Sequence, residues 1–298
     1  MRRLIIGCGY LGKRVAARWL ADGDSVAALT RSPENAEGLR SRGITPVLGD
    51  VMQPETLTAL PEVDTVLWAV GWDRSSGISQ RDVYVTGLQN VLQQVAGRCS
   101  RVIYISSTSV YGQSNGEWID ETSACEPAQP NGQACLDAES SLQPWLPGSG
   151  TRPIATVMRL SGIYGPDRLL SRAATLKSRE PLAGNPEAWL NLIHVDDAAD
   201  AVVTCAAAAE TRPLFLVSDN EPMPRRDYYS ALAELVGAPP PRFSEEEFEA
   251  TTPARGTRTV GFNKRCNNSL VKDFLRWTPR FPTYREGLEH AVNGKPSA

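Results

Sequence analysis

The chain of 298 residues has no long apolar run, and no stretch approaches the roughly 20 apolar residues that cross a membrane. Clusters of basic residues are also absent. Its 31 Lys and Arg oppose 34 Asp and Glu, and the formal net charge of −3 offers no footprint for nucleic acid or an anionic membrane surface. Met1-Arg2-Arg3 precedes a few apolar residues, but glycines and Lys13-Arg14 interrupt them before a signal-peptide core forms. We therefore expect a cytoplasmic protein with a small-molecule partner.

Metal-ligating and disulfide-forming patterns are equally scarce. His194 and His290 are the two histidines, and the six cysteines contain no Cys-x-x-Cys pair. Spacings of that kind mark zinc sites and disulfide frameworks, so we expect no metal and free thiols in a reducing compartment.

A glycine-rich turn near the N-terminus is the most informative feature that is present. The apolar run at residues 3–6 predicts a buried parallel strand, and residues 13–20 predict an amphipathic helix. Gly7, Gly9 and Gly12 lie between them in a Gly-x-Gly-x-x-Gly pattern. In a dinucleotide-binding turn the first glycine permits a tight turn, the second lets a pyrophosphate approach the backbone, and the third lets helix and strand pack closely. The alternative is an ordinary glycine turn.

We expect the cofactor to contact this turn and the ends of the strands that follow it, since ligands of such sheets bind at the carboxyl ends of the strands. In the turn itself the predicted contacts include Tyr10 and Leu11, whose backbone N–H groups would begin the helix. The remaining predicted contacts are Thr30, Arg31, Ser32, Asp50, Val51, Ala69 and Val70.

The end of the second predicted strand favours one cofactor over another. An acidic residue there would bind the ribose 2′-OH of NAD, but the chain reads Thr30-Arg31-Ser32, and an arginine accepts the 2′-phosphate of NADP. We therefore predict NADP, with NAD less favoured. A solvated arginine is the competing interpretation of Arg31, and turn or capping chemistry is the competing interpretation of Asp50.

Strands and helices alternate through the first half of the chain. This pattern predicts an α/β fold with a doubly wound parallel sheet, that is, an NAD(P)-binding Rossmann fold. We place the dinucleotide-binding domain at residues 1–160 and a small C-terminal substrate lobe at 161–298, interleaved with segments that return to the sheet. The predicted strands are 25–30, 45–51, 64–71, 101–107, 154–160, 191–194 and 214–219, and the predicted helices are 33–42, 81–96, 168–179, 198–209 and one that ends near 236.

Four further motifs occur in order along the chain: residues 49–51 (Gly-Asp-Val), 106–112 (Ser-Ser-Thr-Ser-Val-Tyr-Gly), 159–166 (Arg-Leu-Ser-Gly-Ile-Tyr-Gly-Pro) and 191–198 (Asn-Leu-Ile-His-Val-Asp-Asp-Ala). Together with the glycine turn they resemble the NAD(P)-dependent epimerase/dehydratase family, the extended branch of the short-chain dehydrogenase/reductases. The resemblance implies that Ser107 orients a substrate hydroxyl or carbonyl, that Ser106 lies beside the cofactor, and that a Tyr-x-x-x-Lys pair relays the proton.

The chain departs from this family at the relay itself. The matching segment, aligned through its Leu-x-Ala-Glu ending at residues 136–139, has Asn131 at the Tyr position and Cys135 at the Lys position. An amide has no proton to donate at ordinary pH, and a thiol lacks the ammonium charge. The turn departs too, because Ile6 stands where the family has its first glycine. These changes are typical of the atypical short-chain dehydrogenases, whose members share fold and cofactor rather than one reaction.

Other side chains are weaker candidates for the chemistry. The possible acids or bases are Tyr111, Tyr164 and a titrating Cys135, and a structural role is favoured for all three. We expect a buried structural His194, near an Asn191 that faces or supports the substrate pocket. Asp196 and Asp197 are expected to cap the helix that follows. The residues that could meet an anionic substrate, or simply form a solvated face, are Asn263 with the cations Lys264 and Arg265, and the cations Arg276 and Arg285.

Two functions are favoured at this point, and a purely structural subunit is a third alternative. The first is an oxidoreductase or isomerase acting on a small polar substrate, with nucleotide sugars as one candidate class. The second is a non-catalytic NADP(H)-binding redox sensor or regulatory protein, which the loss of both relay residues favours. The family habit of pairing through the helices at 81–96 and 131–143 also makes a homodimer a prediction, although Pro144 ends the second helix early.

Overall fold

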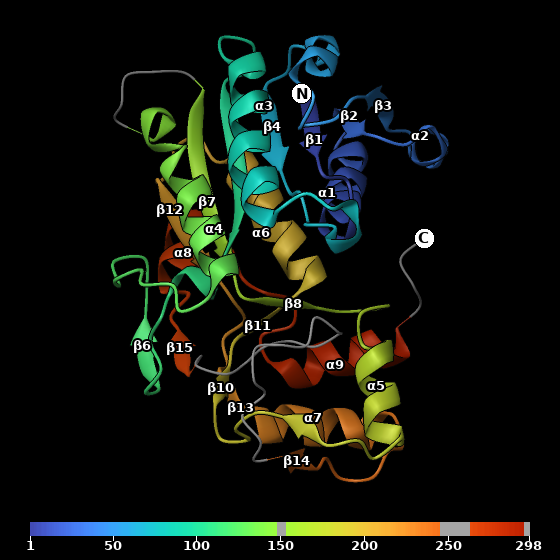
Figure 1. Cartoon of the computed structure of the whole chain (residues 1–298), viewed down its shortest axis with the longest axis vertical. Helices are drawn as coiled ribbons and strands as arrows, with labels where there is room; N and C mark the ends of the chain where they lie inside the picture. Colours follow the sequence, from blue (N-terminus) through green and yellow to red (C-terminus); the bar gives the residue numbers. More distant parts are fainter. Residues whose placement is uncertain (148–152, 245–262, 295–298) are drawn as a thin grey trace.

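The computed structural model describes residues 1–147, 153–244 and 263–294. A seven-stranded sheet lies at its centre in the order β12-β7-β5-β4-β1-β2-β3, and each neighbouring pair is parallel (Figure 1). This confirms the predicted doubly wound sheet. The strands are β1 (Arg2–Ile6), β2 (Ser25–Thr30), β3 (Thr45–Leu48), β4 (Thr65–Trp68), β5 (Arg101–Ser107), β7 (Ile154–Leu160) and β12 (Leu214–Val217).

Helices cover both faces of the sheet because successive side chains of each strand point to opposite sides. In β1, Ile5 packs into the core under α1, α6 and α8, whereas Leu4 and Ile6 pack into the core under α3 and α4. The helices around the sheet are α1 (Tyr10–Ala21), α2 (Pro33–Arg40), α3 (Gly87–Val95), α4 (Pro130–Ser140), α6 (Val195–Ala207) and α8 (Ser269–Leu275).

The strand order reverses at β1, and this reversal positions the candidate site. From β1 the chain proceeds to β2 and β3 on one side, and then returns to place β4, β5, β7 and β12 on the other. In such sheets, ligands bind outside the carboxyl ends of the strands where the order reverses. The residues at that point are the glycine turn after β1 and the segment after β4.

A smaller lobe lies below the sheet in Figure 1 and contains α5 (Leu170–Lys177), α7 (Arg225–Leu235) and α9 (Tyr284–Asn293). Its core includes Tyr164, Tyr228, Tyr229 and Tyr284, all nearly buried. Residues beyond 160 also provide the edge strand β12 and the helices α6 and α8, which pack on the sheet. The N-terminal and C-terminal parts of the chain therefore interleave. Four short strand pairs complete the fold: β8 (Gly162–Tyr164) with β11 (Leu192–His194), β6 (Glu117–Ile119) with β15 (Lys264–Cys266), β9 (Leu182–Ala183) with β14 (Phe243–Ser244), and β10 (Trp189–Leu190) with β13 (Met223–Pro224).

Several predicted boundaries were too generous. The strand expected at 45–51 ends at Leu48, and the one expected at 64–71 covers only Thr65–Trp68, because the chain turns out of the sheet at both carboxyl ends. The predicted helix at 81–96 starts as a π-helical turn, Asp82–Thr86, before continuing as α3. Short 3₁₀ turns lie at Pro54–Ala59, Arg74–Ser76, Thr108–Val110 and Gln143–Trp145.

The cap predicted for α6 was wrong. Asp196 and Asp197 lie inside the first turn, and the His194 side chain caps the helix by accepting a hydrogen bond from the Asp196 backbone N–H at 3.2 Å. Asp197 is instead fully buried and accepts hydrogen bonds from the backbone N–H groups of Arg280 and Phe281, at 2.7 and 2.9 Å. The predicted structural role of His194 agrees with this geometry.

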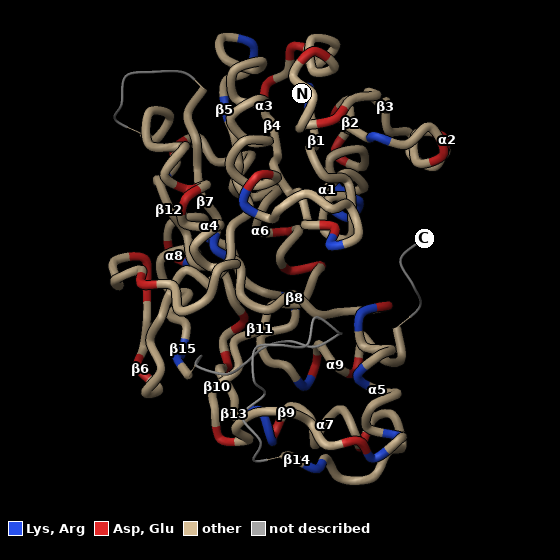
Figure 2. The backbone as a smooth tube through the Cα atoms, viewed as in Figure 1, with Lys and Arg blue, Asp and Glu red and all other residues tan. Residues whose placement is uncertain are grey.

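Positively and negatively charged residues are interspersed over the molecule, and neither sign gathers on one side (Figure 2). No helix among residues 1–147, 153–244 and 263–294 is long and apolar enough to span a bilayer. The acidic run Glu245-Glu246-Glu247, expected to begin a solvated helix, lies outside the described residues.

Candidate functional site

The three glycines of the turn after β1 meet three different environments. Gly7 has a φ of +92°, and a Cβ there would lie 2.6 Å from the backbone of Ala69 and Val70. A Cβ on Gly12 would lie 2.7 Å from the carbonyl oxygen of Gly7, so the helix can approach the strand only without a side chain. A Cβ on Gly9 would meet nothing within 4 Å. The turn therefore leaves its one open position where a ligand would approach.

Helix α1 begins directly beyond this opening, at Tyr10. Its N-cap residue, Gly9, provides no side-chain hydrogen bond, and the first turn contains no acidic residue. Backbone N–H groups at such a helix start carry partial positive charge and are ready donors to a phosphate. The Leu11 side chain is buried under the turn, so its predicted contact with a cofactor would have to come from its backbone. These features fit a dinucleotide pyrophosphate.

The Tyr10 side chain packs against the core and connects the start of α1 with the segment after β8. Its hydroxyl donates to the Pro166 carbonyl oxygen at 2.7 Å, and the guanidinium groups of Arg14 and Arg168 lie 4.3 and 4.2 Å from its ring centroid. Burial raises the pKa of Tyr10 to about 12, so its phenol stays neutral. Arg168 carries no sequence signal for this contact, because a lone arginine beside an aspartate is an ordinary surface pattern.

At the end of β2, Arg31 is about half exposed, and its nearest carboxylate is that of Asp73, 3.9 Å away. The neighbouring Ser32 is already used: its Oγ caps α2 by accepting from the Asn35 N–H, and donates to Glu34. The Thr30 Oγ1 in turn accepts from the Ser32 backbone N–H at 3.3 Å. Of the three residues predicted here, Arg31 is the one whose side chain is exposed and could meet a ligand, because the hydroxyls of Thr30 and Ser32 already have partners.

The next two predicted contact segments lie on either side of the turn. Asp50 accepts from the Met52 backbone N–H at 2.9 Å, which agrees with the turn interpretation of this carboxylate. The Val51 carbonyl accepts from the Asn90 side chain at 2.8 Å, so Val51 is anchored to α3. Ala69 continues the ladder through a hydrogen bond to the Ile6 carbonyl at 2.8 Å, and Ala69 and Val70 form the wall against which Gly7 packs.

A buried ion-pair network supports the predicted catalytic corner. Glu139 accepts from Arg159 at 2.6 Å and from the Ser106 hydroxyl at 2.5 Å, while Arg159 also donates to the Tyr111 hydroxyl at 2.8 Å. Lys264 donates to the Tyr111 carbonyl oxygen. The Ser106 hydroxyl, predicted beside the cofactor, thus points into this network, because strand alternation places Ser106 and Ser107 on opposite faces. Burial raises the pKa of Tyr111, which argues against an acid–base role.

Ser107 and the relay segment do lie together. The Ser107 Oγ accepts from the Ser109 backbone N–H at 3.1 Å, and a Cβ on Gly132 would lie 2.2 Å from the Ser109 carbonyl oxygen. Helix α4 therefore starts directly against the turn that follows β5. Asn131 is exposed there, whereas Cys135 is buried one turn further on. Burial raises the pKa of Cys135 to about 11, so the thiol is neutral and does not replace a lysine charge.

The seam between α6 and the smaller lobe holds the remaining titratable candidates. Tyr164 is nearly buried against His194, with ring centroids 5.4 Å apart, and burial raises its pKa strongly. The His194 Nε2 lies 3.3 Å from the His290 Nδ1. His194, Asp196 and His290 place three ligand atoms within 4.8 Å of one another. The Asp196 carboxylate, however, already lies 3.3 Å from Arg14 and 3.5 Å from Arg18, which disfavours a cation, and the expectation of no metal stays a prediction.

The cations predicted to meet an anionic substrate are not brought together. Arg265 lies between the rings of Trp118 and Trp189, at 5.0 and 5.1 Å, and Arg285 pairs with Glu221 at 2.9 Å. Lys264 is nearly buried, and burial lowers its pKa to about 8. Arg276 lines a separate hollow of about 420 Å³ between α6 and α8. Asn191 holds β15 through hydrogen bonds to Lys264 and Cys266, so its predicted role is a supporting one.

With this geometry in hand, the chain can be compared with known proteins. The model of the NAD dependent epimerase/dehydratase family matches residues 4–215. The chain belongs to the NAD dependent epimerase/dehydratase family. The family assignment agrees with the glycine turn at the switch point of the sheet. The chain is therefore a member of a family of NAD(P)-binding oxidoreductases.

Individual relatives are distant. Protein YeeZ of Escherichia coli K12 is 28% identical over 246 residues, which cover 80% of this chain and 85% of that protein. The dTDP-6-deoxy-L-talose 4-dehydrogenase (NAD(P)(+)) of Kitasatospora kifunensis is 25% identical, covering 98% of this chain and 94% of that enzyme. Among solved structures, a conserved protein of unknown function from Silicibacter pomeroyi superimposes with a TM-score of 0.80 at 28% identity, with 99% of each chain covered.

Proposed function

We propose that this protein is an NADP(H)-dependent oxidoreductase that acts on a hydroxyl or carbonyl group of a small polar substrate. The observation that carries the proposal is the open position at Gly9, which lies directly before the unfilled N-terminus of α1 at the switch point of the sheet. A pyrophosphate placed there would find backbone donors and no side chain in its way.

Positive charge near the turn supports NADP over NAD. Arg31 is accessible at the end of β2, and Lys13 and Arg42 both act electrostatically on Cys8 in the turn. A 2′-phosphate is a dianion that such cations stabilise. The carboxylates of Asp73 and Glu34 lie close enough to Arg31 and Ser32 to weaken this preference, so we expect selectivity rather than exclusion of NAD.

The chain's own residues have separable tasks in this proposal. Bound NADPH would supply a hydride to the substrate. Ser107, half-buried at the end of β5, would orient the reacting oxygen, and Asn131 would hydrogen-bond the substrate at the exposed start of α4. Cys135 would shape the wall behind them. We propose nucleotide sugars as the first substrate class to test, because the Kitasatospora kifunensis relative is by name a dTDP-sugar dehydrogenase.

A redox sensor is the second candidate, and a specific observation favours it: the relay position holds an amide and a neutral buried thiol. A sensor must bind NADP⁺ and NADPH with different affinities, since a ligand with equal affinity for two states shifts no equilibrium. Binding measurements with both redox forms therefore separate the two candidates. A homodimer through α3 and α4 stays a prediction under either one.

The test is a calorimetric titration of the protein with NADP⁺, NADPH, NAD⁺ and NADH. Gly9→Val is the diagnostic variant, and Gly38→Val in α2 is its matched control, because a Cβ at either glycine meets nothing within 4 Å. We expect Gly9→Val to abolish binding and Gly38→Val to leave it unchanged. Unchanged affinity in Gly9→Val, or no binding by the unaltered protein, would overturn the cofactor site.

A second measurement addresses the reaction. The protein is incubated with NADP⁺ or NADPH and a panel of nucleotide sugars and small carbonyl compounds, and nicotinamide absorbance is followed. Turnover supports the oxidoreductase. Similar affinity for both redox states would argue against the sensor, and a large preference for one state without turnover would argue for it.

A further inference from the structure

One phenol approaches the relay position from outside the relay segment. Tyr84 lies in the π-helical turn Asp82–Thr86 that leads into α3, and it packs against two clusters of buried side chains. One is the core beneath α3 and α4, and the other contains Cys135, Val110 and Tyr111. Tyr84 therefore lies beside the helix turn that bears Asn131 and Cys135.

An ion pair ties the start of the π-helical turn to α4. Arg81, directly before the turn, donates to the Asp137 carboxylate of α4 at 2.8 Å, and Gln133 of α4 donates to the same carboxylate at 2.8 Å. Helices α3 and α4 lie side by side on one face of the sheet, with their first turns at the carboxyl ends of the strands (Figure 1). A π-helical turn inserts one extra residue per turn and re-aims the side chains within it, and such turns occur frequently at functional sites.

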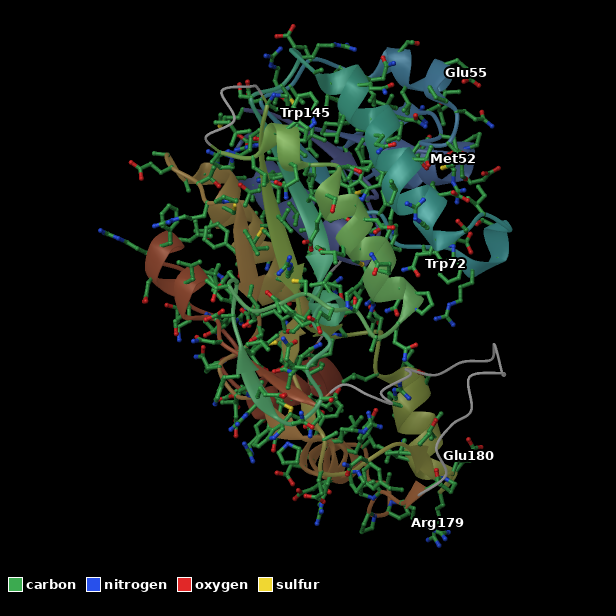
Figure 3. All side chains as sticks on the ribbon, turned by 60° about the vertical axis from the view of Figure 1, so that its left-hand side comes forward. Met52, Glu55, Trp72, Trp145, Arg179 and Glu180 are labelled. Carbon is green, nitrogen blue, oxygen red and sulfur yellow. The ribbon has the colours of Figure 1, made fainter. Side chains whose placement is uncertain are left out.

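The Tyr84 hydroxyl lies within hydrogen-bonding reach of the loop that follows β4. Hydrogen bonding from the Gln80 side chain and the Trp72 backbone acts on it, and Trp72 lies on the loop directly after β4 (Figure 3). The same β4 end, at Ala69 and Val70, forms the wall of the glycine turn. The phenol thus lies between the predicted path of the dinucleotide and the relay helix, and it is only half-buried.

We propose that Tyr84 is the proton donor of this site and supplies, from α3, the phenol that Asn131 lacks. The inference rests on the proposed oxidoreductase function. In carbonyl reduction, the carbonyl carbon would receive the hydride that a bound NADPH would supply. The Tyr84 O–H bond breaks as its proton moves to the carbonyl oxygen, the new O–H bond completes the alcohol, and the phenolate then takes a proton from solvent.

The surroundings of Tyr84 suit donation better than abstraction. Burial raises the pKa of Tyr84 above its ordinary value, so the phenol is neutral at pH 7 and can donate. A neutral phenol is a poor base at that pH. The site is therefore expected to favour carbonyl reduction over alcohol oxidation near neutral pH.

The experiment uses ¹⁹F NMR of the full chain labelled uniformly with 3-fluorotyrosine. The resonance missing from Tyr84→Phe identifies Tyr84, and the one missing from Tyr229→Phe, in the core of the smaller lobe, provides a control. Each is titrated with pH in the complexes with NADP⁺ and NADPH. The nicotinamide ring is positively charged in NADP⁺ and neutral in NADPH, and a nearby positive charge favours the phenolate.

If Tyr84 lies against the nicotinamide, its pKa will be lower by about one unit in the NADP⁺ complex than in the NADPH complex, while Tyr229 is unaffected. Equal pKa values for Tyr84 in two complexes that calorimetry shows to be formed would overturn the proposal and leave the cofactor site intact. Failure of both dinucleotides to bind would overturn the proposed function and this inference together.

Activity provides the second readout. With a carbonyl substrate from the panel, Tyr84→Phe is expected to lower the rate of reduction about 10²–10⁴-fold, the usual contribution of a positioned acid, with unchanged affinity for NADPH. Tyr229→Phe should retain the full rate. A Tyr84→Phe variant that reduces the substrate at the unaltered rate would show that the proton comes from elsewhere.

Discussion

The glycine turn and the catalytic corner lie at the same edge of the sheet but are built in opposite ways. The turn after β1 is made of backbone, with Gly9 open to ligand and Gly7 packed on Ala69 and Val70. The corner at the start of α4 is supported by the buried ion pair Glu139–Arg159. Asn131 is exposed there, at the position where the family resemblance predicts the reacting tyrosine. Both regions depart from the expected family pattern, the turn at Ile6 and the corner at Asn131 and Cys135, but the change in the turn leaves Gly9 open. Cofactor binding and chemistry can therefore vary independently on this fold.

The largest expected effect comes from breaking the buried support of the corner. Glu139→Leu should lower the free energy of unfolding by about 3–5 kcal/mol, because it leaves the Arg159 charge buried without its carboxylate. Chemical denaturation measures the loss. The double variant Glu139→Leu/Arg159→Met should recover much of it, and failure to do so would mean that the Ser106 and Tyr111 hydrogen bonds, rather than the charges, hold the corner.

The second prediction concerns pH and two buried groups at the seam beneath α6. Burial lowers the pKa of His194 to about 4 and raises that of Asp197 to about 6. As pH falls from 6.5 to 4, the unfolded chain protonates its histidine before the folded one, so the His194 contribution is lost at up to about 1.4 kcal/mol per pH unit. As pH falls from 6 to 3.8, the folded chain protonates Asp197 first, so stability is gained.

These two contributions oppose each other, and single variants should separate them. Stability of His194→Asn, which keeps a capping acceptor, should rise as pH falls from 6 to 4, whereas stability of Asp197→Asn should fall between pH 6.5 and 4. Denaturation curves recorded at several pH values measure both slopes. Parallel slopes in the two variants would contradict the assignment.

The third prediction tests the turn itself. Gly7→Ala should lower the free energy of unfolding by about 2 kcal/mol, because the new Cβ meets the Ala69–Val70 backbone at 2.6 Å and alanine is strained at a φ of +92°. Gly9→Ala should change stability by less than about 0.5 kcal/mol, since nothing lies near its Cβ. Thermal unfolding compares the two. Equal losses would show that the turn is uniformly packed and has no open position.

The smallest expected effect concerns cofactor preference. Arg31→Ala should weaken NADPH binding about tenfold, which is about 1.4 kcal/mol, while NADH binding and stability stay nearly unchanged. Arg40→Ala in α2, which removes an exposed arginine paired with Glu37, is the control. Calorimetry measures the affinities. Equal weakening for both cofactors would assign Arg31 to the shared part of the dinucleotide or to the pair with Asp73.

Local patterns were enough to predict the sheet and the turn. Apolar runs of strand length, alternating with amphipathic helices, specify a parallel sheet because each strand must be covered on both faces. The spacing of Gly7, Gly9 and Gly12 predicts the turn because close approach of backbone to backbone requires glycine. The altered relay at Asn131 and Cys135 stays a prediction, because it rests on the resemblance of residues 136–139 to the Leu-x-Ala-Glu ending of the family's relay segment.

Contacts between distant segments could not be read in this way. Tyr84 lies 47 residues before Asn131, and only the π-helical turn and the packing of α3 on α4 bring its side chain to Cys135. The cap of α6 is His194 rather than Asp196 or Asp197. Asp197 cannot serve as the cap because its carboxylate accepts hydrogen bonds from the backbone N–H groups of the distant residues Arg280 and Phe281.

The Ser106 hydroxyl donates to Glu139, a contact that also joins distant segments. The Glu139 carboxylate is buried beside Arg159, and a buried charge is stable only when it is paired and hydrogen-bonded. The sequence by itself therefore determined the order of elements and the backbone turn, which depend on short-range sterics and periodicity. The tertiary structure decided which polar side chains are consumed in its interior and which remain exposed to a ligand, because that depends on charge, burial and packing between distant segments.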